Sequence, residues 1–212
     1  MALADLPASP ADAAIGNDML EPRTEEKLRR GFRRFLNPFM LSLWRLGLGW
    51  WFNVWPEFSG RILVIAHTGR KTGRRRHALV NFASVNGELY CVAAFGSISD
   101  WYNNVMANPA VEVWTPDGWW AGLVEDISGC ENRLALMRQV MIGSGFVAYL
   151  FGFNPHQMTD AELEAMTAKY RLLRIRRSEA RTGPGGPGDL AWVWPVLVMI
   201  LLPLALWRRG RK

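Results

Sequence analysis

Cysteine and histidine are scarce in this chain, and their arrangement argues against a metal centre. Among 212 residues there are two cysteines, Cys91 and Cys130, and three histidines, His67, His77 and His156. The cysteines form no CxxC pair and have no histidine at metal-ligand spacing, unlike the ligands of a zinc site. We therefore expect no metal, and the cysteine content does not require an oxidising compartment.

A secretory signal is also missing, and the glycine turn in the middle of the chain does not match the common nucleotide-binding motifs. Residues 1–24 are rich in Ala, Pro and Asp and have neither a basic n-region nor a long apolar run, so we predict a disordered tail. The glycine turn at 68–73 fits neither GxGxxG nor GxxxxGK[ST]. No acid–base pair is apparent in the sequence, and we expect a structural role for His67.

Basic residues exceed acidic ones, giving a net charge of +6, and they fall into four clusters. Three clusters, at 29–34, 171–181 and 208–212, adjoin apolar segments, as contacts with lipid headgroups would. The fourth, at 70–76, lies in a glycine-containing turn. Nucleic-acid binding is disfavoured, because this turn has no interleaved aromatic residues and the chain has no recognised motif.

The central part of the chain alternates short apolar runs with turn signals, which predicts antiparallel strands. We expect strands near 61–66, 76–84, 88–94, 110–114, 119–126 and 170–177. Asn86-Gly87 is a strong signal for a type I′ hairpin, and Asn108-Pro109 ends a short helix that begins near Ser99 or Asp100. Helical patterns follow at 128–142 and 159–169. Residues 60–180 are thus predicted to form one α+β domain, a meander or small barrel.

Apolar segments flank this domain on both sides. Residues 25–59 are expected to form amphipathic and apolar helices, with 39–55 lying in a membrane interface or packed on the barrel. Residues 181–190 read as a Gly/Pro linker. Residues 191–207 are uncharged and about 25 Å long as a helix, so we expect a transmembrane or membrane-embedded helix there. The chain is then membrane-associated through a single C-terminal anchor, with lipid as a partner and its main domain in the cytoplasm.

The turn at 68–73 is the clearest candidate for chemistry. Gly69 and Gly73 allow the backbone to bend sharply and to expose N–H groups. Arg70, Lys71 and the arginines that follow surround these groups with cationic donors, which suits a phosphate or a carboxylate. On spacing alone, a solvated basic hairpin tip remains the alternative.

Two sequence blocks resemble the deazaflavin-dependent nitroreductase and quinone reductase family. The first is IAHTGRKTGRRR at 65–76; the second combines VAAFG at 92–96, DWYNN at 100–104 and ANPAVEV at 107–113. The resemblance covers roughly 38–177 and implies a split β-barrel of the flavin-binding type with flanking helices. It also implies an oxidoreductase that transfers hydride from reduced coenzyme F420 to an organic acceptor such as a quinone. The positions that match the family's cofactor-binding residues are Thr68, Gly69, Arg70, Lys71, Thr72, Gly73, Arg76, Trp101, Tyr102 and Asn104.

Two departures from the family pattern leave the acceptor side open. Phe95-Gly96-Ser97 stands where family members often have a serine followed by a lysine or a glycine pair, and Asn81 replaces a common tyrosine. Asn81 and Tyr149 are therefore only candidates for contact with the acceptor, and no catalytic residue is assigned.

Two other readings stay open. FMN in the same barrel is the first, although the surplus of cations favours the more acidic deazaflavin. The second is a non-catalytic module at the membrane surface that binds an anionic ligand through the basic hairpin.

Overall fold

The computed structural model describes residues 31–150 and 152–209. A boundary between Pro38 and Phe39 divides the chain into two units, and of the first the structure describes residues 31–38. The first unit contributes the short π-helix η2. In chain order the elements are η2 (Phe32–Leu36), α2 (Asn37–Arg45), η3 (Gly49–Asn53), α3 (Pro56–Ser59), β1 (Ile62–Thr68), β2 (Arg75–Val85), β3 (Glu88–Ala93), η4 (Gly96–Ile98), α4 (Asp100–Ala107), β4 (Ala110–Thr115), β5 (Gly118–Asp126), α5 (Arg133–Gly143), α6 (Phe146–Leu150), α7 (Asp160–Thr167), β6 (Arg171–Ala180) and α8 (Val193–Arg209).

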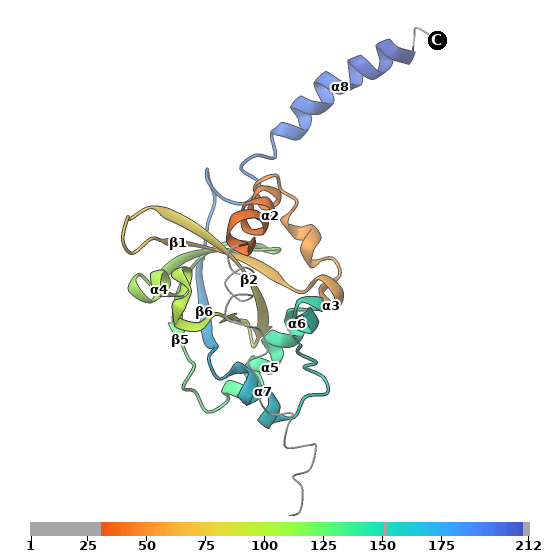
Figure 1. Ribbon diagram of the computed structural model, residues 1–212. Coiled ribbons are helices and arrows are strands. Elements are labelled where there is room, and N and C mark those ends of the chain that lie inside the picture. The colour runs from red at the N-terminus through yellow and green to blue at the C-terminus, as the bar shows by residue number, and fades with distance from the viewer. Residues whose placement is uncertain (1–30, 151, 210–212) are drawn as a thin grey trace, which may run out of the picture. The chain divides into compact units, whose positions relative to one another are not determined.

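The six strands close into an antiparallel barrel in the order β1-β2-β3-β6-β5-β4 (Figure 1). Closure comes from the pairing of β1 with β4, where Val64 faces Trp114. The prediction of an α+β barrel with flanking helices is therefore confirmed, in the form of a closed six-stranded barrel.

The β2–β3 hairpin turns at the predicted dipeptide. Asn86 and Gly87 both have positive φ, 52° and 83°, and Val85 pairs with Glu88 across the turn. A two-residue turn of this kind matches the twist of the flanking strands, which explains why the local sequence is sufficient to specify it.

Alternation along each strand directs apolar side chains into the barrel. Leu63, Ile65, Val113 and Ile175 belong to this interior cluster and are fully buried. Helix α4 contributes Val105 and Tyr102 to the same cluster, so it covers one end of the barrel.

A second cluster lies on the outer face of β2, β3 and β6, under α5 and α7. Met137 and Val140 of α5 and Leu163 of α7 pack there against Tyr90 and Leu172. Helix α7 starts at a complete capping box, in which Thr159 and Glu162 bond reciprocally.

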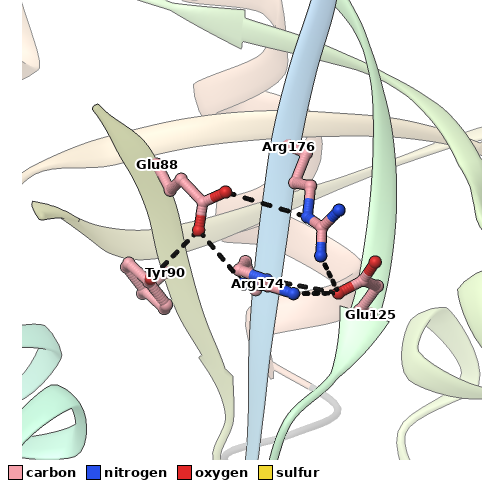
Figure 2. Close-up of polar contacts among 5 residues, drawn as sticks. All are labelled: Glu88, Tyr90, Glu125, Arg174 and Arg176. Carbon is pink, nitrogen blue, oxygen red and sulfur yellow. Dashed lines mark hydrogen bonds and ion pairs between the residues drawn. The ribbon is translucent and has the colours of Figure 1, made fainter. Parts of the chain in front are cut away.

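Charged residues cross the outer face of β3, β6 and β5 beside this cluster (Figure 2). Arg174 pairs with Glu125 at 2.5 Å and with Glu88 at 3.4 Å, and Arg176 approaches the same two carboxylates. The hydrogen bond from Arg174 lowers the pKa of Glu125. The network links three neighbouring strands through their side chains.

The apolar segment 39–55 is divided between α2 and η3 rather than forming one helix. Gly47 adopts φ 80° between the two elements, a conformation that favours glycine. Trp44 of α2 is buried against Val64 and Trp114 on the outside of the barrel. A Cβ on Gly49 would lie 2.2 Å from the Trp44 ring, so the chain turns back directly over this tryptophan.

Helix α8 corrects the expected transmembrane segment at 191–207. It has 17 residues, with Pro203 inside it and Arg208 and Arg209 in its last turn. At about 1.5 Å per residue it spans about 25 Å, less than a hydrocarbon core of about 30 Å. Within the part of the chain that the structure describes, no helix is long and apolar enough to cross a membrane. The predicted C-terminal transmembrane helix, and the membrane-associated location that depended on this anchor, are therefore wrong.

Candidate functional site

The β1–β2 hairpin closes through a compact glycine turn at 68–73. The backbone N–H groups of Thr72 and Gly73 both donate to the carbonyl of Gly69, at 3.2 and 2.8 Å, and Gly69 donates to the carbonyl of Arg74. Gly73 has φ 64°. A Cβ on Gly69 would lie 2.9 Å from Nε of Arg76, so the side chain of Arg76 folds over bare backbone at this point.

Helix α4 holds this turn in place through Arg70. The side-chain oxygen of Asn104 accepts from the backbone N–H of Arg70 at 3.1 Å and from its Nη1 at 2.9 Å. Nη1 also donates to the carbonyl of Asp100 at 3.3 Å, and Nη2 lies 3.4 Å from the Asp100 carboxylate. The two sequence blocks are therefore in direct contact, and α4 lies beside the hairpin (Figure 1).

The remaining cations of the turn divide into two groups. Lys71, Arg74 and Arg76 are exposed, and their side chains form no ion pair with any residue that the structure describes. Arg75 instead pairs with Glu112 and lies over the ring of Trp119, with 6.0 Å to its centroid. Three cations thus remain available to an anionic ligand, whereas Arg75 is engaged by Glu112 of β4.

Two buried polar atoms beside the turn lack hydrogen-bond partners among the described residues. They are Nδ1 of His67, at the end of β1, and Oγ of Ser99, directly before α4. The His67 side chain is 4% exposed, and burial lowers its pKa to about 4. The imidazole is therefore neutral at physiological pH, and the nearby charge of Arg76 favours the neutral form further.

The aromatic residues of α4 face the barrel more than the turn. Tyr102 is buried and donates to Oδ2 of Asp126 at 2.5 Å, and its burial together with this hydrogen bond raises its pKa. Trp101 is partly buried against the interior cluster. Of the three predicted α4 residues, Asn104 alone bonds to the turn.

The two acceptor-side candidates lie away from the basic turn. Asn81 pairs with Ile62 at the opposite end of the β1–β2 ladder, six residues from the turn and hence about 20 Å along the strands. Tyr149 lines a cavity of about 340 Å³ with Met141, Ile142, Gly145, Pro155 and His156. The predicted residues therefore form two regions, a cationic one at the turn and a mostly apolar one near α6.

One residue that positions the turn was missed by sequence reasoning. Asp100 contacts Arg70 through both its carbonyl and its carboxylate. Its spacing of four residues from Asn104 places both on one face of a helix, so that spacing could have indicated a shared partner.

Comparison with known proteins defines the class of this barrel. The family model described as F420H(2)-dependent quinone reductase matches residues 53–147, which include the turn, α4 and the strands between them. The resemblance noted in the sequence is thereby confirmed. The chain is a deazaflavin-dependent oxidoreductase, and coenzyme F420 is its cofactor.

Solved structures provide more distant likenesses. They include the F420-H2 dependent reductase FDR-A, with 25% identity over 55% of this chain and 94% of that one and a TM-score of 0.40. An F420 reductase has 22% identity over 59% and 92%, with a TM-score of 0.40. The heme storage protein HutZ from Vibrio cholerae has 12% identity over 61% and 89%, with a TM-score of 0.42. At these scores the likenesses establish neither fold nor function, and no curated protein matches the chain.

The residues at the turn fit the chemistry of F420, which carries a phosphate and an acidic tail. Lys71, Arg74 and Arg76 supply exposed cations without ion-pair partners among the described residues. The absence of a side chain at Gly69 leaves bare backbone beneath Arg76. Charge-assisted hydrogen bonds from such donors are the usual way to hold phosphate and carboxylate.

Proposed function

We propose that this protein oxidises F420H2 and reduces a quinone, with the anionic part of the cofactor held at the 68–76 turn. The observation that carries the proposal is the contact of Arg70 with Asn104, which joins the two blocks of the family sequence into one site. Bound F420H2 supplies the hydride. The quinone gains that hydride and one proton and becomes a quinol.

The turn residues bind and orient the cofactor in this proposal. Lys71, Arg74 and Arg76 donate to phosphate and carboxylate oxygens, while Thr68, Thr72 and the two glycines shape the backbone around them. Arg70 has a different role, because Asn104 and Asp100 already occupy its guanidinium. It fixes the turn against α4, where Trp101 and Tyr102 border the site.

In this proposal the quinone binds near α6. Asn81 and Tyr149 are proposed to contact the quinone, and the Tyr149 side chain is 54% exposed beside the apolar walls of its cavity. An exposed phenol next to apolar surface suits a flat ring that carries carbonyl oxygens. The separation of about 20 Å along β2 leaves room for an extended cofactor between the two regions.

Steady-state kinetics of the full chain test the acceptor. F420H2 is mixed with a water-soluble quinone, and the return of the visible absorbance of oxidised F420 is followed. We expect turnover, with a raised KM for quinone in Tyr149→Phe and Asn81→Ala and an unchanged KM for F420H2. Lys71→Ala is the matched control, in which the KM for F420H2 rises instead. A protein that binds F420H2 tightly but reduces no quinone contradicts the proposed acceptor.

A further inference from the structure

His67 is one of two buried polar groups beside the turn, with Ser99, that the proposed function does not use. It is the sixth residue of β1, directly before Thr68 and the glycine turn. Its Nδ1 is buried and has no hydrogen-bond partner among the described residues. An unsatisfied buried polar atom costs about 1–3 kcal/mol, so in a folded protein such an atom calls for an explanation.

The position of His67 connects it to Arg76. The two residues are direct cross-strand partners in the β1–β2 ladder, and directly opposed residues share one face of the sheet about 5 Å apart at their Cβ atoms. Nε of Arg76 lies close above Gly69. The side chain that adjoins the imidazole is therefore the same one that is expected to engage the cofactor's anionic group.

We infer that His67 is a further cofactor-binding residue, whose Nδ1 donates a hydrogen bond to an anionic oxygen of bound F420 when Arg76 swings out to engage the same group. This inference rests on the proposed cofactor site and revises the expectation of a structural role for His67. The ligand chemistry is an anionic oxygen, from either the phosphate or the acidic tail. The unpartnered nitrogen then gains its partner only in the complex.

A neutral imidazole suits this role. Desolvation keeps the pKa of His67 near 4; the backbone of Thr68 raises it by less, and the charges of His77 and Arg76 lower it further. Neutral histidine carries one N–H donor and adds no charge to the cluster. It can therefore add a directed hydrogen bond without adding to the repulsion among the cations around it.

Imidazole NMR tests the inference directly, because the chain has only three histidines. The full chain is labelled with 15N-histidine, the signals are assigned with single His→Gln variants, and the protein is titrated with F420. We expect the ring-nitrogen signals of His67 to shift on binding, while those of His77, whose ring packs at a tilt against Trp114 with 5.0 Å between ring centroids, stay unchanged.

Titrations with two further ligands show whether the oxygen that His67 contacts belongs to the phosphate or to the acidic tail of F420. A deazaflavin that lacks both phosphate and acidic tail should leave the His67 signals unchanged. Inorganic phosphate should move them if the partner is the phosphate, whereas a shift with F420 alone assigns the acidic tail. His67→Leu should weaken F420 binding about tenfold or more, as expected for loss of a hydrogen bond to a charged group, and should leave the truncated deazaflavin unaffected.

The outcomes separate this inference from the proposed function. If F420 binds, as shown by fluorescence, and the His67 signals do not move, the inference is wrong and the cofactor site stands. If F420 does not bind at all, both fail. If His67→Leu does not fold, the NMR titration of the native chain still tests the inference.

Discussion

The side-chain oxygen of Asn104 accepts two hydrogen bonds from Arg70, one from its backbone N–H at 3.1 Å and one from its guanidinium at 2.9 Å. Asn104 is 4% exposed, whereas Arg70 lies at the surface, so the contact is partly buried. It fixes the basic turn relative to α4 and determines which way the remaining cations face.

Replacing Asn104 with alanine should loosen the turn without removing any cation. We expect Asn104→Ala to weaken F420 binding about tenfold, because a hydrogen bond to a charged group contributes about 1.5–3 kcal/mol and the Arg70 N–H also loses its acceptor. Equilibrium titration measures the change.

The matched control for Asn104→Ala is Asn103→Ala. Asn103 lies on the same helix but donates to the carbonyls of Ser97 and Ser99, away from the turn. Equal losses of affinity in the two variants would show that α4 as a whole, and not the Arg70 contact, is responsible.

The two glycines of the turn should respond differently to alanine. Gly73 has φ 64° and nothing within 4 Å of an added Cβ, so Gly73→Ala should cost about 1–2 kcal/mol of stability through backbone strain. At Gly69 the added Cβ would meet Nε of Arg76 at 2.9 Å. Gly69→Ala should therefore displace Arg76 and lower F420 affinity more than stability. Chemical denaturation and titration of both variants separate the effects, and the reverse pattern would contradict this assignment.

The ion pairs of Glu125 should make the folded state less stable at acidic pH. The hydrogen bond from Arg174 lowers the pKa of Glu125 below its ordinary value of 4.5. The resulting stabilisation is complete above pH 4.5 and is lost as the pH falls through the lowered, folded-state pKa. Glu125→Gln should reduce the fall in Tm between pH 5 and pH 3, the pH range in which carboxylates titrate.

Glu131→Gln serves as the control for this pH dependence. Glu131 is exposed and lies outside the network of Figure 2. An acid response that is identical in Glu125→Gln, Glu131→Gln and the native chain would show that the network does not contribute.

Asp189 should tie the 181–190 segment to α2. Its carboxylate accepts from Nε and Nη2 of Arg45 at 3.0 and 2.9 Å, while the N–H groups of Gly188 and Leu190 donate to the carbonyls of Trp44 and Arg45. Asp189→Asn should speed hydrogen exchange at the Gly188 and Leu190 amides by severalfold, since these bonds would open more often. Unchanged exchange at both amides would show that the backbone bonds hold without the ion pair.

Local signals in the sequence were sufficient to predict the hairpins and the basic turn. Asn86-Gly87 requires positive φ at both positions, and that requirement is visible in two letters. The family blocks placed Arg70 and Asn104 in one site, because a recognised motif carries contacts that spacing alone does not. The direct bond between these two residues was not itself predicted and is visible only in the structure, and their role in cofactor binding stays a prediction.

Contacts between distant residues could not be predicted. In the sequence Arg75 looked equivalent to the neighbouring basic residues. In the structure it pairs with Glu112, 37 residues away, and so is not available to an anionic ligand as Lys71, Arg74 and Arg76 are. The division of the 39–55 segment at Gly47 depends on how Trp44 packs against Trp114. The helix at 193–209 has the apolar composition of a membrane span, yet its length stops short of one, and composition alone does not set where a helix begins and ends.

Titration of the purified full chain with F420 and FMN side by side, followed by fluorescence, tests the central claim most directly. The native chain, Lys71→Ala, Arg76→Ala and Arg75→Ala are compared at low and high salt. We predict that F420 binds more tightly than FMN. Lys71→Ala and Arg76→Ala should each weaken F420 binding about tenfold or more and reduce its salt dependence, while Arg75→Ala stays close to native. Equal or tighter binding of FMN, or F420 binding that is indifferent to Lys71 and Arg76, would contradict the account.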